Sequence, residues 1–179
     1  SVIDQTQTGA GARALAARLA APLRDLDEIK RRQDSVQHFV DDHTVREAVR
    51  NFLKGCPDLE RALSRLTLGR GGPRDLAAIR DGLSLSSNIQ DLLKGDNICE
   101  AINRAATNIG THNTLVEKLT RALAPDLPLY ARDGGFIAYG YAAAFDELRN
   151  LRDQSRRFIL RLQDKYTSDT GIPNLKIKH

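Results

Sequence analysis

The stretch with the clearest chemical potential is the glycine-rich segment at residues 68–76, LGRGGPRDL. Glycines and a basic side chain ahead of a helix can hold a phosphate, because backbone N–H groups and the helix dipole attract anions. However, the segment lacks the GxxxxGK[ST] spacing of a P-loop, and no strand precedes it. We therefore favour a loop and helix cap over a phosphate site, which leaves Arg70 available to donate to helix-end carbonyls.

The other reactive side chains do not form a catalytic or metal-binding pattern. The chain has four histidines, none in an HExxH arrangement: His38, His43, His112 and His179. Two acidic pairs, Asp41/Asp42 and Asp146/Glu147, are consecutive in sequence, so their members point to different faces of a helix and cannot form an acid–base dyad. No GxGxxG or GxSxG motif is present. We expect no catalytic residue, no metal site and no cofactor site in this chain.

Cysteine usage and hydropathy indicate the compartment. Cys56 and Cys99 fit neither a CxxC nor a zinc-ligand spacing, which favours free thiols in a reducing environment. No apolar run approaches the ~18 residues of a membrane span, and no signal pattern opens the chain. We expect a soluble, intracellular protein without a membrane partner. The ends at Ser1 and His179 look cut, so we expect a piece of a longer protein.

Composition favours helices. The 179 residues are 41% hydrophobic but only 5% aromatic, so Leu, Ala, Ile and Val must build the core. The net charge of +4 permits contact with nucleic acid without requiring it, because basic and acidic residues are mixed along the chain. The sequence predicts an all-α fold.

Breaks and apolar periodicity divide the chain into helices. We expect Asp25 or Asp27 to cap the second helix and Thr44 to cap the third, which Gly55 and Pro57 end. Residues 57–83 are expected to hold two helices separated by LGRGG, and Pro73 suits the first position of the second. The remaining helices are expected near residues 12–20, 87–94, 97–108, 114–124 and 141–167.

The last of these helices has an unusual design. Its apolar residues alternate four- and three-residue steps, as in the seam of a coiled coil: Tyr141, Ala144, Leu148, Leu151, Ser155, Phe158 and Leu162. At 1.5 Å per residue it spans roughly 35–40 Å, more than the core of a small domain needs. It follows Gly134, Gly135 and Gly140, which tolerate positive φ. We interpret it as a strut that leaves a helical core, with Leu148, Leu151, Phe158 and Leu162 as its structural seam.

Several segments together resemble one family. The order of the blocks TQTGAGARALAARLAAPLRDLDEIKRRQDSVQHFV, GCPDLERALSRLTLGRGGPRDLAAIRDGL, RDGGFIAYGYAAAFDELRNLRDQS and DTGIPNLKIKH is similar to that of the core region of the MutS family of DNA mismatch repair proteins. Two residues depart from the family pattern. Ala142 stands where the family has an Asp suited to capping the long helix, and Phe145 stands where it prefers Leu. We expect a looser start of the helix here.

The resemblance implies a division and a role. Residues 1–140 would form the helical core, 141–168 the long lever helix and 169–179 the start of the clamp domain, with a possible short extended piece at the C-terminus. The segment would couple an absent ATPase domain mechanically to the DNA-binding clamp. By the same resemblance the parent binds mismatched double-stranded DNA, uses ATP and Mg, forms a homodimer, recruits MutL, and works at the nucleoid in the bacterial cytoplasm. Lys176 and Lys178 would begin the DNA-binding strand, while this piece itself would not be an enzyme.

Three other interpretations remain open at this stage. The first is a MutS-like paralogue without a repair role, although the TGI-x-x-LK pattern at residues 170–176 favours MutS proper. The second is a free-standing helical scaffold that binds a partner helix through its seam. The third is a nucleic-acid-binding module, which would need clustered basic residues with stacking aromatics, and the sequence shows no such cluster.

Overall fold

The prediction of an all-α fold is confirmed. The computed structural model describes residues 2–95, 98–172 and 176, which form helices and no β-sheet. It divides into two compact units, residues 1–136 and 137–179. The first unit contains α1 (Gly9–Ala20), α2 (Leu26–Asp41), α3 (His43–Lys54), α4 (Leu59–Thr67), α5 (Pro73–Leu92), α6 (Glu100–Ile109), α7 (Asn113–Ala122) and the 3-10 helix η1 (Ala131–Asp133). The second contains α8 (Ala143–Thr170).

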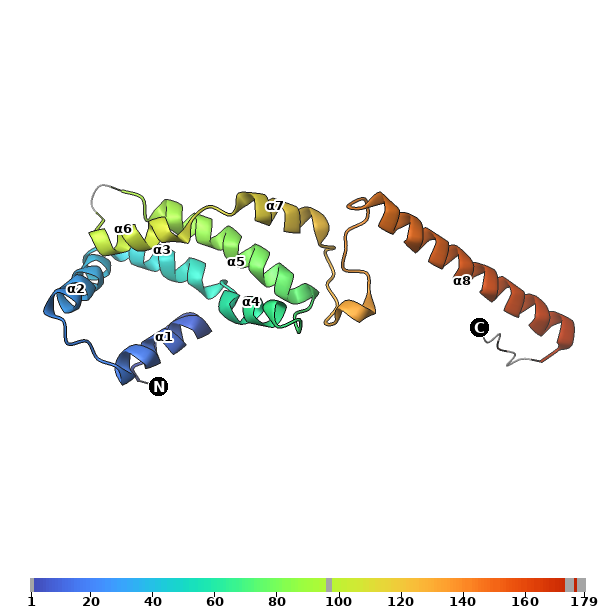
Figure 1. Ribbon diagram of the computed structural model, residues 1–179, viewed down its shortest axis with the longest axis horizontal. Helices are drawn as coiled ribbons and strands as arrows, with labels where there is room; N and C mark the ends of the chain where they lie inside the picture. Colours follow the sequence, from blue (N-terminus) through green and yellow to red (C-terminus); the bar gives the residue numbers. More distant parts are fainter. Residues whose placement is uncertain (1, 96–97, 173–175, 177–179) are drawn as a thin grey trace. The chain divides into compact units, whose positions relative to one another are not determined.

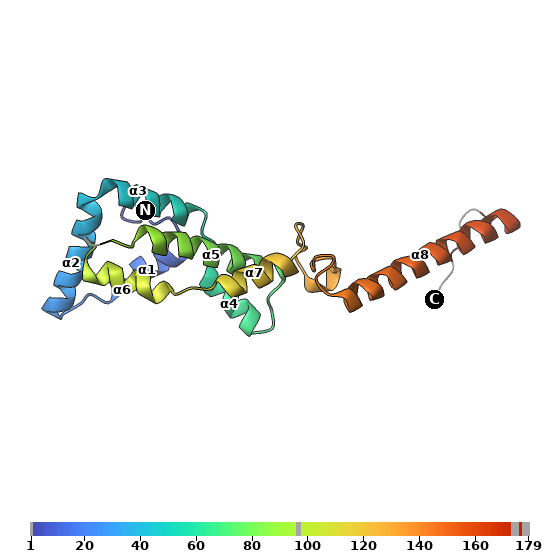
Figure 2. The ribbon, with the colours of Figure 1, turned by 90° about the horizontal axis from the view of Figure 1, so that it is seen from above.

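Helix α5 organises the first unit. It packs against α3, α4, α6 and α7, and the two views in Figures 1 and 2 show these helices around it. Pro73 occupies its first position as expected and is fully buried. Close packing against α4 depends on Gly82, because a Cβ there would lie only 2.4 Å from Cδ2 of Leu59. The close approach of α4 and α5 therefore depends on Gly82, which leaves room for the Leu59 side chain.

The apolar core of the first unit lies at the other end of α5. Its most buried members are Leu93, Ile102 and Ala106. Partly buried side chains pack around them: Phe39, Val45, Val49, Ile89, Ile98 and Cys99. These residues come from α2, α3, α5, α6 and the segment between α5 and α6, and so this cluster ties these helices together.

Two sequence expectations about this unit are wrong. Asp42, not Thr44, caps α3, because the Asp42 carboxylate accepts from the backbone N–H of Val45 at 2.9 Å. No separate helix occupies residues 87–94, since α5 continues for 20 residues to Leu92. The polar residues that suggested a break are accommodated, as the hydroxyl of Ser86 donates to the Leu83 carbonyl one turn earlier at 2.8 Å.

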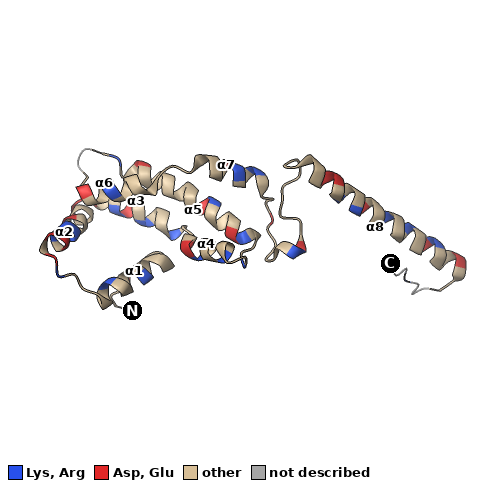
Figure 3. Cartoon of the chain, viewed as in Figure 1, with Lys and Arg blue, Asp and Glu red and all other residues tan. Residues whose placement is uncertain are grey.

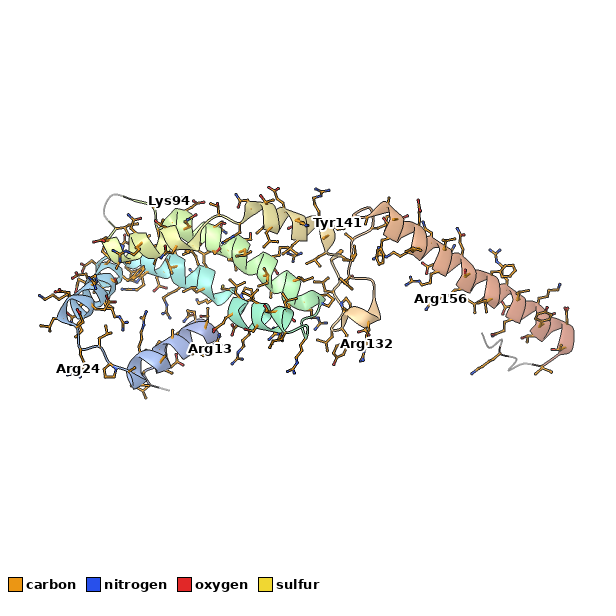
Figure 4. The ribbon with its side chains drawn as sticks, viewed as in Figure 1. Arg13, Arg24, Lys94, Arg132, Tyr141 and Arg156 are labelled. Atoms are coloured by element: carbon orange, nitrogen blue, oxygen red, sulfur yellow. The ribbon has the colours of Figure 1, made fainter. Side chains whose placement is uncertain are left out.

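Helix α1 is held by charge rather than by burial. None of its residues, all of which are described, is buried. Arg13, labelled in Figure 4, donates to both carboxylate oxygens of Asp58 at 2.7 and 2.9 Å and to Glu60 at 2.7 Å. The Arg13 guanidinium lowers the pKa of Asp58 to about 2. Asp58 also accepts from the N–H of Arg61 and so caps α4, which means that one carboxylate serves both helices.

Candidate functional site

The glycine-rich loop between α4 and α5 is closed by its own side chains. Asp75 accepts from the Gly72 N–H at 2.9 Å and pairs with Arg65, which lowers the pKa of the Asp75 carboxyl. This carboxylate already occupies the positive end of the α5 dipole and would repel a phosphate there. The Arg70 backbone N–H donates to the Arg65 carbonyl at 2.8 Å and ends α4. The geometry supports the loop-and-cap interpretation.

The described residues do not gather into a reactive cluster elsewhere. No group of three or more His, Cys, Asp or Glu side chains within them could hold a metal ion. Cys56 and Cys99 are both free thiols, and burial is the main cause of the raised pKa of Cys56. Similarly, none of the described helices is long and apolar enough to cross a membrane.

The remaining candidate is the second unit, which begins with a glycine turn. Gly140 adopts φ +83°, in the left-handed region that favours glycine. The chain then enters α8 at Ala142, which makes no side-chain capping bond. The side chain of Ala142 thus supplies no cap, while the looser start expected from the sequence stays a prediction. A helix start without a capping side chain leaves backbone N–H groups that need another partner.

The turn that leads into α8 is held by a set of contacts that we call the base network: Gly140, Asp146, Arg149 and the carbonyl of Ile137. Asp146 accepts from the Gly140 N–H at 2.7 Å and from Arg149 at 3.2 Å. Arg149 also donates to the Ile137 carbonyl at 2.7 Å, and its guanidinium lies 4.4 Å from the centre of the Phe145 ring. The network thus connects the glycine turn to the first two turns of α8.

Along the rest of α8 the apolar seam is open. Leu148, Leu151 and Phe158 are about three-fifths exposed, at 63%, 60% and 63%, whereas Leu162 is half-buried. Charged residues of both signs lie along the helix in Figure 3. An exposed apolar stripe flanked by charges is typical of a helix that pairs with another. The seam itself remains a prediction.

The proposed DNA-binding lysines fall at the end of the chain. Lys176 is exposed and lies outside any helix, and Lys178 lies outside the described residues. The possible extended piece at the C-terminus also falls mainly outside them, at residues 173–175 and 177–179. Their DNA contact therefore stays a prediction.

Sequence reasoning missed the base network. It gave Asp146 and Arg149 no structural role, yet their side chains are only 10% and 15% exposed. A signal was available, because the pair has the i,i+3 spacing of interacting helix residues and follows a start that lacks a capping residue. What the spacing could not show is that both side chains turn back onto the preceding loop.

Comparisons with known proteins agree with the sequence resemblance. The family model described as MutS domain III matches residues 1–170. Over 179 residues the chain is 46% identical to the DNA mismatch repair protein MutS of Roseobacter denitrificans and 48% identical to that of Paracoccus denitrificans, covering 100% of this chain and 20% of each relative. The MutS of Rhodopseudomonas palustris is 48% identical over 181 residues, covering 99% of this chain and 19% of its own length. The chain spans about a fifth of these relatives and belongs to the MutS family, as its domain III.

Proposed function

We propose that this chain is the core and lever of a MutS-type mismatch repair protein and passes motion between its ATPase and DNA-binding parts. Residues 1–140 serve as the core, 141–168 as the lever and 169–179 as the start of the clamp. The observation that carries this proposal is the design of α8. Over its 28 residues, all described, it buries Asp146 alone. A helix of about 42 Å that buries nothing apolar suits transmission between distant parts better than core packing.

The activity of the longer protein follows as part of the same proposal. The relatives bear the name of DNA mismatch repair proteins. The longer protein binds mismatched double-stranded DNA as a homodimer, hydrolyses ATP with Mg and recruits MutL in the bacterial cytoplasm, at the nucleoid. This chain supplies no catalytic residue to that cycle. Instead, it carries the displacement that ATP produces.

Weakening the middle of α8 with glycine substitutions tests the coupling. In a full-length MutS that carries this domain, Gln154, Ser155 and Arg156 are replaced together by glycine. The replacement costs about 1 kcal/mol per residue relative to alanine in a helix interior. We expect DNA binding without nucleotide and ATP hydrolysis without DNA both to persist. The change in DNA affinity on adding ATP should be lost.

The matched control replaces the same three residues by alanine, which removes the same side chains but keeps the helix. Fluorescence anisotropy of a labelled mismatched duplex, with and without ATP, measures the coupling in both variants. An equal ATP response in the glycine and alanine variants would refute the role of α8 as a lever.

A further inference from the structure

We propose that Asp146 and Arg149 are positioning residues that join the glycine turn to α8, so that residues 137–149 behave as one body. We call residues 137–149, held together by the base network, the joint. Its role in transmitting motion rests on the proposed coupling function, but its existence does not. A helix that transmits a displacement is useful only if it does not bend or fray where it begins. The base network lies at that point.

Burial separates this pair from the other charges of the helix. Asp146 and Arg149 are only 10% and 15% exposed, whereas the neighbouring ion pair of Arg152 and Asp153 is 56% and 50% exposed. Exposed ion pairs contribute little, but a shielded charge makes stronger hydrogen bonds and is costly to leave without partners. Asp146, the one buried acidic residue of α8, therefore lies where the helix begins.

The directions of the hydrogen bonds show that this is more than an ion pair within a helix. The Asp146 carboxylate must accept, because its partner at Gly140 is a backbone N–H. Arg149 must donate, because its partner at Ile137 is a carbonyl oxygen. These two bonds reach six and twelve residues back along the chain and fix the turn at two separate points.

The charge of Asp146 offsets part of the missing cap, although the carboxylate accepts from Gly140 and not from a first-turn N–H of α8. Ala142 offers no side-chain acceptor at the start of α8, and an acidic group near this end also favours the helix dipole. Asp146 supplies that negative charge from one turn inside the helix. As a result, the part of the crossover least restrained by the network lies upstream of Ile137, at Gly134 and Gly135, which both have positive φ.

The amide proton of Gly140 reports the joint directly. In the 179-residue chain, hydrogen exchange is followed by NMR for the wild type, Asp146→Ala, Arg149→Ala and the exchanged pair Asp146→Arg with Arg149→Asp. We expect Gly140 to exchange roughly 10- to 100-fold faster in Asp146→Ala, as the loss of a hydrogen bond to a charged group implies. The exchanged pair should be as fast, because arginine cannot accept from the Gly140 N–H.

Two controls keep this test decisive. Asp153→Ala removes the exposed ion pair of the same helix and should leave Gly140 unchanged. If Asp146→Ala loses α8 helicity by circular dichroism, Asp146→Asn keeps one acceptor oxygen and should retain part of the protection. Full protection of the Gly140 amide in the exchanged pair would show that the contact is a simple salt bridge and would overturn the proposal. An unchanged exchange rate of Gly140 in Asp146→Ala would overturn it as well.

The joint and the coupling function can fail separately. In the full-length protein we expect Asp146→Ala to weaken the effect of ATP on DNA affinity while leaving nucleotide-free binding intact. If the glycine replacement in α8 abolishes that effect but Asp146→Ala does not change it, the proposed function stands and the joint has no part in it. If the glycine replacement has no effect, the proposed function fails, and Gly140 exchange still decides whether the joint exists.

Discussion

The two units use the same kind of helix in opposite ways. In the first, α5 contacts four other helices, and its neighbours bury Leu93, Ile102 and Ala106. In the second, α8 is longer, exposes most of its large apolar residues and buries an acid. Amphipathic periodicity therefore does not reveal which surface a helix buries within its own chain. In α8, Leu148, Leu151 and Phe158 stay exposed within this chain despite the apolar periodicity.

The difference also changes what holds each unit together. Apolar burial stabilises the first unit at about 25 cal/mol per Å² removed from water. The start of α8 depends instead on directional hydrogen bonds between a few groups. Substitutions that shorten apolar side chains should therefore lower the stability of the first unit much more than that of α8.

The largest expected effect tests whether shortening an apolar side chain costs more stability in the first unit than on α8. Ile102→Ala removes three carbon atoms from a side chain whose residue is only 6% exposed, so we expect a loss of about 2–5 kcal/mol in the free energy of unfolding. Leu151→Ala, on the open seam, should change it by less than about 0.5 kcal/mol. Urea titration at low protein concentration, followed by circular dichroism, measures both. Similar losses in the two variants would break the comparison.

The next effect concerns the open seam itself. Because Leu148, Leu151 and Phe158 are exposed, we expect the 179-residue chain to self-associate through α8. Phe158→Glu combined with Leu162→Glu should weaken the association at least ~100-fold, since each buried large apolar side chain contributes about 1.5–3 kcal/mol. Sedimentation velocity over a concentration series gives the association constant.

The control for this experiment is Arg152→Glu combined with Arg156→Glu, which places two acids on α8 outside the seam residues. It should associate more strongly than the seam variant. If wild type and seam variant are both monomers of equal helicity, the seam is not a pairing surface.

A smaller effect is the dependence of α1 on the ion pairs of Arg13 with Asp58 and Glu60. Arg13 lowers the pKa of Asp58 from 3.8 to about 2, so this contribution to stability is complete above pH 3.8 and is lost as the pH falls through about 2. We expect the amides of α1 to exchange several-fold faster in Asp58→Asn at neutral pH, with α4 retained because Asn also caps helices. Arg18→Gln, which removes a charge from the same helix, is the control and should leave exchange unchanged. Equal protection in Asp58→Asn and wild type would show that α1 docks by other means.

The sequence predicted the parts of the fold that depend on local chemistry. Pro73 at the first position of α5 and Asp25 as the cap of α2 are both confirmed, because these preferences act over one helical turn. The two wrong predictions, the Thr44 cap and a separate helix at residues 87–94, also come from rules that act over one helical turn. Thr44 and Asp42 are both good caps, and a local rule could not choose between them. The serines of α5 diluted the apolar pattern, although their hydroxyls are satisfied within the helix.

The contacts at the base of α8 could not be predicted from the sequence. The missing cap at Ala142 was evident from the sequence, but the base network beside it was not. Asp146 and Arg149 reach back to a turn whose backbone is set by Gly140 at φ +83°. Only the folded turn brings its N–H and carbonyl groups toward these side chains. Candidate residues that act through loop backbone are consequently the hardest to find from spacing alone.

The smallest expected effect concerns DNA. We expect Lys176 and Lys178 only to begin the DNA-binding strand of the clamp, so binding by the 179-residue chain should be weak and equal for a mismatched duplex and its matched counterpart. Each phosphate contact adds about 0.9 to the slope of log affinity against log salt, so Lys176→Ala and Lys178→Ala should each reduce that slope by about 1. Anisotropy titrations at several salt concentrations measure it. Lys118→Ala removes the same charge from an exposed position on α7 and should leave the slope unchanged. Tight binding that prefers the mismatch would instead place a recognition surface within the first unit, and the contrast between a packed core and an open lever would no longer describe how this domain meets DNA.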